Sequence, residues 1–192
     1  MRVIAGRLGG RSLSAPRGLA TRPTSDRVRE ALFSILGDVS GAVVLDLYAG
    51  TGALGIEALS RGASRAVFVE SARPALAVLR QNLSDLGLTD VATVVAQPVE
   101  RARDRLLAEG PFDLVLADPP YALVAEAAAA LGRFAAAGPR FLNPEGKIVL
   151  EHAGRDAPPD VLGLVRAGTR SYGEASLTFY ELPVPALGEG ML

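Results

Sequence analysis

The sequence predicts an α/β fold in which helices cover both faces of an open, mostly parallel sheet. From residue 42 onward, short apolar segments alternate with segments of helical periodicity. The apolar segments lack the polar–apolar alternation of half-exposed strands, as expected for parallel strands that are covered on both faces. The chain has 192 residues, of which 49% are hydrophobic and 21% charged. These values predict about one domain with a substantial core, and they exclude wholesale disorder.

The individual elements after residue 42 follow from this alternation. The expected strands are Val43–Leu47, Ala66–Glu70, Val91–Ala96, Phe112–Ala117 and Lys147–Glu151. The helices expected between them are Ala53–Arg61, Pro74–Leu86, Val99–Ala108 and Leu123–Ala137. Two later segments, Gly163–Arg170 and Ala175–Leu182, are expected to pair as an antiparallel hairpin. Five parallel strands and this hairpin give a predicted seven-stranded sheet.

The N-terminal part predicts a hairpin, a linker and a helix. Arg2–Ala5 and Arg11–Ser14 flank a glycine-rich turn, which predicts a two-stranded β-hairpin. Thr24 or Ser25 is expected to cap a helix that ends at Gly37. We therefore expect a basic hairpin arm with a linker over residues 1–23, one domain over residues 24–182 and a mobile tail over residues 183–192.

The composition excludes several classes of function. The chain has no cysteine, which excludes disulfides, thiolate nucleophiles and cysteine-bound zinc or iron–sulfur centres. Its one histidine, His152, leaves little material for a histidine metal site or a Ser-His-Asp triad. The start of the chain lacks the apolar segment of a signal peptide, and no apolar run approaches 18 residues. We expect a cytoplasmic protein that binds neither metal nor membrane.

The charge is distributed unevenly along the chain. Residues 1–30 hold seven arginines and two acidic residues, for a net charge of +5, whereas the remainder carries −6. A basic arm on a mildly acidic body is suited to holding nucleic acid, and Arg7, Arg11, Arg17 and Arg22 are the candidate contacts. A solvated arginine surface without a partner explains the same pattern equally well.

A glycine-rich segment follows the first strand of the α/β region. Gly50-Thr51-Gly52-Ala53-Leu54-Gly55 matches GxGxxG, so a ligand can approach the backbone at the carboxyl edge of the sheet. Asp46 precedes Gly50 by four residues, and its carboxylate disfavours the pyrophosphate of a dinucleotide at this place. The spacing D-x-x-x-G-x-G is typical of enzymes that bind S-adenosylmethionine, which carries a sulfonium and no phosphate.

Glu70 lies at the end of the second strand, twenty residues after Gly50. A carboxylate at this place can accept hydrogen bonds from both ribose hydroxyls of a nucleoside ligand. Proteins that bind NAD use the same device, so Glu70 supports an adenosine-containing ligand without choosing among such ligands.

A third motif, Asp118-Pro119-Pro120-Tyr121, ends the fourth strand. The prolines stiffen the turn, and we expect them to direct the Asp118 carboxylate and the Pro119 carbonyl into the cleft. Two acceptors suit an exocyclic amine, because they hold its hydrogens and turn its lone pair out of conjugation with the ring. Tyr121 offers a flat face on which an extruded base can stack.

These motifs together resemble the S-adenosylmethionine-dependent amino-methyltransferases with a (D/N)PP(Y/F) motif, and more narrowly the RsmD family. The narrower resemblance rests on Arg22-Pro23-Thr24-Ser25-Asp26-Arg27-Val28-Arg29-Glu30, supported by Arg2–Gly6, Gly10-Arg11 and Leu54–Gly62. It covers about residues 2–182 and implies a Rossmann-like class I methyltransferase fold. One departure is Gln97-Pro98, where the family usually has Asp or Asn followed by Ala against the adenine edge.

The resemblance implies methyl transfer from S-adenosylmethionine to the N2 amine of one guanine in 16S ribosomal RNA. Asp118, Pro119 and Tyr121 are the expected catalytic residues, and a monomer is expected to act on the RNA alone or in a small-subunit assembly intermediate. The expected cofactor residues are Thr24, Asp46, Tyr48, Gly50, Gly52, Glu70 and Gln97.

Three other functions stay open at this point. A DNA adenine-N6 methyltransferase would share the cleft chemistry, but it normally needs a target-recognition region for which this chain has little room. A nicotinamide oxidoreductase would use the glycine loop and leave the Asp118–Tyr121 motif without a role. A catalytically silent RNA-binding module is the third. His152, at the end of the fifth strand, is a candidate base that we expect to be packed or solvent-facing instead.

Overall fold

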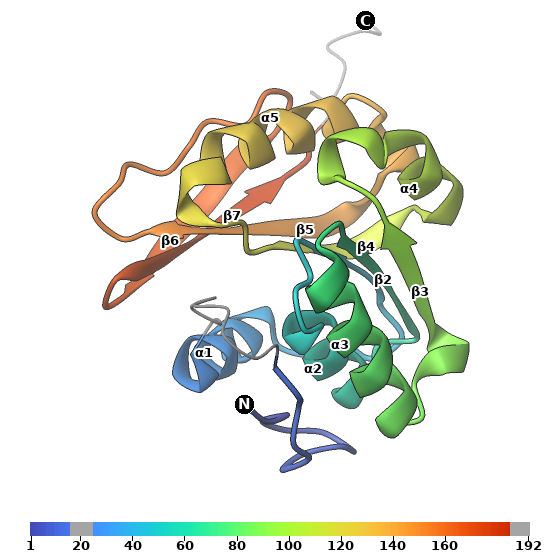
Figure 1. Cartoon of the computed structure of the whole chain (residues 1–192). Coiled ribbons are helices and arrows are strands. Elements are labelled where there is room, and N and C mark those ends of the chain that lie inside the picture. Colours follow the sequence, from blue (N-terminus) through green and yellow to red (C-terminus); the bar gives the residue numbers. More distant parts are fainter. Residues whose placement is uncertain (16–24, 185–192) are drawn as a thin grey trace, which may run out of the picture.

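The predicted sheet is present in the computed structural model, which describes residues 1–15 and 25–184. Within that part of the chain, seven strands form one sheet in the order β3-β2-β1-β4-β5-β7-β6 (Figure 1). Strands β1 to β5 are parallel, and β7 is antiparallel to both of its neighbours. The strands are β1 Val43–Leu47, β2 Arg65–Glu70, β3 Ala92–Ala96, β4 Phe112–Ala117, β5 Leu142–Ala153, β6 Val165–Tyr172 and β7 Ala175–Glu181.

Helices cover both faces of this sheet, as expected. In Figure 1, α1 to α3 lie on one side of the strands, and α4 and α5 lie on the other. Alternate residues of a strand point to opposite faces, so Val44 packs in one core cluster and Leu45 in the other. The helices are α1 Asp26–Leu36, α2 Ala53–Ser60, α3 Arg73–Asp85, α4 Arg103–Glu109 and α5 Val124–Ala135.

The first 15 residues pack against the body of the protein, and the expected two-stranded hairpin is not confirmed. A single antiparallel bridge joins Arg2 and Ser12. Beside this bridge, the Val3 N–H donates to the Arg11 carbonyl at 2.9 Å and the Leu13 N–H to the Met1 carbonyl at 3.0 Å, whereas the N–H groups of Ile4 and Ala5 donate to the side chain of Glu57. Val3, Leu8 and Leu13 are buried in the core cluster formed with α1 to α3, so this segment does not project from the body.

Two elements have a boundary that differs from the sequence expectation by more than two residues. The helix expected over Val99–Ala108 is divided into a 3₁₀ turn at Val99–Arg101 and helix α4. Strand β5 begins at Leu142 instead of Lys147, because its first residues pair with the start of β4 across an irregular register between Phe112 and Leu114. Residues 16–23 of the expected arm and linker, and residues 185–192 of the expected tail, lie outside the described residues. No helix in the described ranges is long and apolar enough to cross a membrane.

Candidate active site

A cavity of about 840 Å³ lies at the carboxyl ends of the central strands, where open α/β sheets bind their ligands. Its volume is within the usual range of about 300–1,000 Å³ for small-molecule sites. The cavity brings together eight of the residues predicted from sequence: Asp46, Tyr48, Gly50, Glu70, Gln97, Asp118, Pro119 and Tyr121. Two predicted cofactor residues do not line it, since Thr24 lies outside the described residues and Gly52 faces the protein interior.

The two glycines Gly50 and Gly52 serve different purposes in the loop after β1. Gly52 has φ of +83°, and a Cβ there would lie 2.4 Å from Leu79 Cδ1. A Cβ on Gly50 would meet only the Tyr48 carbonyl oxygen, at 3.9 Å. Gly50 therefore leaves open space beside the cavity, whereas Gly52 lets α2 and α3 pack closely.

Asp46 is buried at the end of β1 and holds the start of α2. Its Oδ2 atom accepts a hydrogen bond of 2.8 Å from the Gly55 N–H. Burial raises the pKa of Asp46 to about 7; the Gly55 N–H lowers it, and the charges of Asp118 and Glu70 raise it further. The side chain thus combines an anchoring role with a position on the cavity wall.

Glu70 has a carboxylate that the surrounding backbone already orients. Its Oε2 accepts from Gly50 N at 2.8 Å, and its Oε1 accepts from Ser71 N and Ala72 N, both at 2.7 Å. A carboxylate has about four lone-pair positions, so these bonds leave roughly one free, on Oε2. The site therefore suits a bond from one ligand hydroxyl more readily than from the pair expected from the sequence.

Tyr48 adds a strained position to the same wall. It has φ of +59°, and it is the non-glycine residue with positive φ in the described ranges. Its hydroxyl is buried without a hydrogen-bond partner, and burial raises its pKa to about 12. Backbone strain of this kind gathers at ligand sites. Gln97 also lines the cavity and donates from Nε2 to the Arg101 carbonyl at 3.3 Å.

The Asp118–Tyr121 turn forms the opposite side of the cavity. Asp118 is half-buried and Pro119 is buried, while Tyr121 is 37% exposed and begins a 3₁₀ turn. The Tyr121 hydroxyl donates to the Glu174 carbonyl at 3.3 Å, which links this turn to the turn between β6 and β7. The ring is thus held at the mouth of the cavity with part of its surface open.

Sequence reasoning missed Asn82 of α3, which is 2% exposed. Its Oδ1 accepts from Ser14 N at 2.9 Å, and its Nδ2 donates to the carbonyls of Thr51 and Ser14 at 3.0 and 3.2 Å. Asn82 therefore joins the N-terminal segment to the glycine loop. An amide at an apolar position of an amphipathic helix, next to Leu83, was the available signal.

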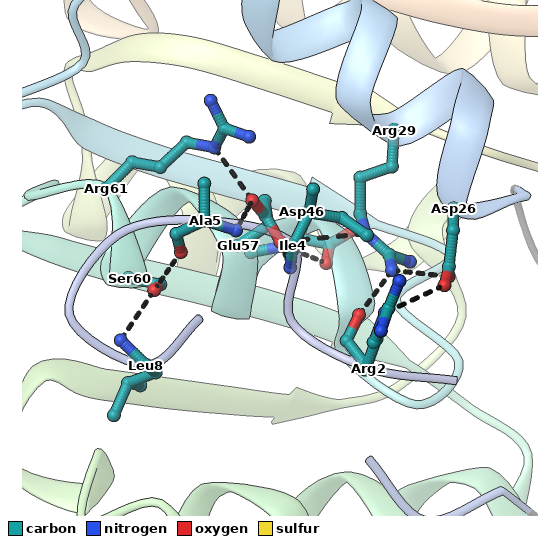
Figure 2. Close-up of polar contacts among 11 residues, drawn as sticks. Arg2, Ile4, Ala5, Leu8, Asp26, Arg29, Asp46, Glu57, Ser60 and Arg61 are labelled. Atoms are coloured by element: carbon teal, nitrogen blue, oxygen red, sulfur yellow. Dashed lines mark hydrogen bonds and ion pairs between the residues drawn. The ribbon is translucent and has the colours of Figure 1, made fainter. Parts of the chain in front are cut away.

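A second missed group is the buried polar network around Glu57 (Figure 2). The Glu57 carboxylate accepts from Ile4 N at 2.7 Å, Ala5 N at 3.0 Å and Arg61 Nε at 2.7 Å. It also lies 3.7 Å from Nε of Arg29, which is fully buried. The network connects the N-terminal segment, α1 and α2, and α1 begins beside Ser25 on the cavity wall.

The predicted RNA contacts are placed only in part. Arg7 is exposed, and Arg11 donates from Nη2 to the Asp85 carbonyl at 3.2 Å. Arg17 and Arg22 lie outside the described residues. His152 is buried and hydrogen-bonded to Thr178 at 2.9 Å, away from the cavity wall, which agrees with a packed histidine. Over residues 1–15 and 25–184, no cluster of three or more His, Cys, Asp or Glu could hold a metal ion.

Comparison with known proteins relates this arrangement to one family. The family model described as "Conserved hypothetical protein 95" matches residues 1–181. The Bacillus subtilis protein named "Putative rRNA methyltransferase YlbH" is 38% identical over 186 residues, which are 94% of this chain and 98% of that protein. "Ribosomal RNA small subunit methyltransferase D" of Escherichia coli K12 is 41% identical over 123 residues, 63% of this chain and 60% of that protein.

A solved structure agrees with this relationship. The "Putative methyltransferase yhhF from Escherichia coli" superposes with a TM-score of 0.77 at 34% identity, covering 95% of this chain and 97% of that one. The chain therefore belongs to the RsmD family.

Proposed function

We propose that this protein is an S-adenosylmethionine-dependent methyltransferase that methylates the N2 amine of a guanine in 16S ribosomal RNA. The observation that carries the proposal is the joint position of the glycine loop, Glu70 and the Asp118–Tyr121 turn on one cavity. The names of the relatives support ribosomal RNA as the substrate class. The pairing of an amine-binding turn with a nucleoside-binding loop supports transfer to an exocyclic nitrogen.

The cavity residues fit S-adenosylmethionine, whose bound form would supply an electrophilic methyl carbon on a sulfonium. Glu70 keeps an acceptor position on Oε2 for a ribose hydroxyl. The open space beside Gly50 lets a ligand approach the backbone. Gln97 lines the cavity and would contact the adenine edge, while Pro98 has no N–H to offer.

Asp118 and Pro119 would position the guanine amine for direct in-line displacement. The Asp118 carboxylate and the Pro119 carbonyl accept the two N2 hydrogens and turn the nitrogen lone pair toward the methyl carbon. When bound, S-adenosylmethionine would supply the methyl carbon as its S–C bond breaks with the electron pair going to sulfur, and the methylated amine would lose one proton to solvent. The Asp118 carboxylate stabilises the positive charge that develops on N2, and Tyr121 stacks against the base.

The test measures both product and rate. Purified protein is incubated with S-adenosylmethionine and 16S RNA or small-subunit particles that lack the modification, and nucleosides are identified by mass spectrometry. The expected product is N2-methylguanosine. Asp118→Ala should lower the single-turnover rate by roughly 10²–10³ and leave S-adenosylhomocysteine affinity within a few-fold. Exclusive formation of N6-methyladenosine, or full activity in Asp118→Ala, would overturn the proposal.

A further inference from the structure

Glu151 is a buried carboxylate that lines the same cavity as Asp118 and has no part in the mechanism above. It lies at the carboxyl end of β5 and is 7% exposed. The parallel register pairs Ala117 of β4 with Leu150 of β5. The residues that follow this pair, Asp118 in the turn after β4 and Glu151 on β5, both line the cavity.

The residues near Glu151 do not provide a second buried carboxylate at this end of β5. Successive side chains of a strand point to opposite faces. His152 is bonded to Thr178 and is not on the cavity wall. Glu174 also lines the cavity, but it is exposed in the turn between β6 and β7. A carboxylate that is both buried and fixed on a strand is suited to recognising one particular hydrogen-bond donor.

The Watson–Crick edge of guanine has three hydrogens in a row, two on N2 and one on N1. If guanine N2 is the nucleophile, Asp118 and the Pro119 carbonyl accept the two N2 hydrogens, and the N1–H needs a third acceptor. Adenine and cytosine also carry an exocyclic amine, but the ring nitrogen beside it presents a lone pair. A buried carboxylate next to the amine-binding turn would attract the first arrangement and repel the other two.

We propose that Glu151 is a specificity-determining residue that accepts a hydrogen bond from guanine N1–H and excludes adenine and cytosine. This inference rests on the proposed methylation of guanine N2. It assigns the choice of base to β5, whereas Asp118 and Pro119 on the β4 turn serve the transfer itself. Extruded bases are recognised in this manner by hydrogen bonds to the Watson–Crick edge.

The test compares two RNA substrates at the position that the wild-type protein modifies, mapped beforehand by mass spectrometry. One carries guanine, and the other carries 2-aminopurine, which keeps the N2 amine but lacks N1–H. Wild-type protein should methylate guanine at least about 10²-fold faster in single turnover, since a site built for a donor rejects an analogue without it. In Glu151→Gln, whose amide can donate to the bare N1, the ratio should fall to less than about tenfold.

A control variant, a second Glu151 variant and the identity of the wild-type product separate the possible outcomes. Glu145→Gln, exposed on the same strand and outside the cavity, should keep the wild-type ratio. Glu151→Ala should lower the ratio as well, and it serves if the glutamine variant does not fold. An unchanged ratio in a folded Glu151 variant overturns the role of Glu151. Absence of N2-methylguanosine with the wild-type protein instead refutes the proposed function, before any variant is compared.

Discussion

Asp46 shows how a single residue in this site carries an energetic cost. Burial raises its pKa from an ordinary value near 3.8 to about 7, so the folded protein retains a proton that the unfolded chain releases above about pH 4. The contribution of Asp46 to stability is therefore fully present below about pH 4 and is lost as the pH rises toward and through 7.

This loss of stability with rising pH predicts how Asp46→Asn should behave. The variant should lose the decline in stability that Asp46 causes between about pH 4 and 7, because its amide carries no titrating proton and can still accept from Gly55 N–H. Between about pH 4 and 7, the free energy of unfolding of the wild type should fall relative to that of the variant by at most a few kcal/mol, at about 1.4 kcal/mol per pKa unit. Guanidinium unfolding of both proteins from pH 4.5 to 8 checks the expectation, and parallel curves would contradict it.

The Glu70 carboxylate accepts from three backbone N–H groups, so Glu70 holds the local loop in addition to its proposed role in cofactor binding. Glu70→Ala should weaken S-adenosylhomocysteine binding by about 1.5–3 kcal/mol, the range for hydrogen bonds to charged groups. Isothermal titration measures this loss, and thermal unfolding of the same sample measures damage to the loop. Glu70→Gln keeps one acceptor oxygen and should lose less affinity. Unchanged affinity in Glu70→Ala would remove Glu70 from the cofactor site.

At the scale of elements, α2 is held at both ends by groups from distant parts of the chain. Its first turn donates to Asp46, and its last turn carries Glu57 and Ser60, which bind the N-terminal segment (Figure 2). Arg61 also lies over the Phe33 ring of α1 at 4.9 Å. Helices of this length are marginal alone, so the geometry of α2 depends on these contacts.

Glu57→Ala should therefore destabilise the fold strongly. It removes the acceptor of two backbone N–H groups and leaves the fully buried Arg29 guanidinium without its Glu57 partner. Breaking a buried ion pair on one side costs about 3–5 kcal/mol. Denaturant unfolding measures the loss, with Glu30→Ala on the exposed face of α1 as the matched control, expected within about 0.5 kcal/mol of wild type. A loss below about 1 kcal/mol for Glu57→Ala would contradict this account.

At the scale of the whole molecule, the charge of +5 over residues 1–30 has two explanations. Some of the arginines stabilise the fold, and others are available to bind RNA. Arg29 is buried and serves the fold, and Arg11 bonds the carbonyl of Asp85 at the end of α3. Arg7 is exposed on the packed N-terminal segment and is available to a partner. The net charge of a segment therefore overstates the number of arginines that can reach RNA.

The salt dependence of RNA binding distinguishes the two explanations. If Arg7, Arg11 and Arg17 each contact a phosphate, changing all three to alanine should flatten the plot of log affinity against log salt by roughly two units, at about 0.7 per contact on single strands. Cofactor affinity should not change. Alanine at Arg103, Arg105 and Arg140, all exposed and outside the first 30 residues, provides the control. An unchanged slope in a folded triple variant would place RNA contacts elsewhere.

The sequence by itself determined the order of the elements, the parallel sheet and eight residues of the cavity wall. These features depend on local patterns: apolar strands between helices, glycines after β1, and acceptor residues at the ends of β2 and β4. Because parallel strands present their carboxyl ends at one edge, Asp46, Glu70 and Asp118 had to meet there once the strand order was known.

Only the tertiary structure decided what happens to the N-terminal segment and which buried polar groups matter. Glu57 and Ser60 lie more than 50 residues from the backbone groups that they bind, and Asn82 lies 68 residues from Ser14. No local periodicity encodes such pairs. The first residues turn back on themselves through backbone hydrogen bonds from Val3 N to Arg11 O and from Leu13 N to Met1 O, while the N–H groups of Ile4 and Ala5 bind the distant carboxylate of Glu57, because a buried carboxylate must find donors.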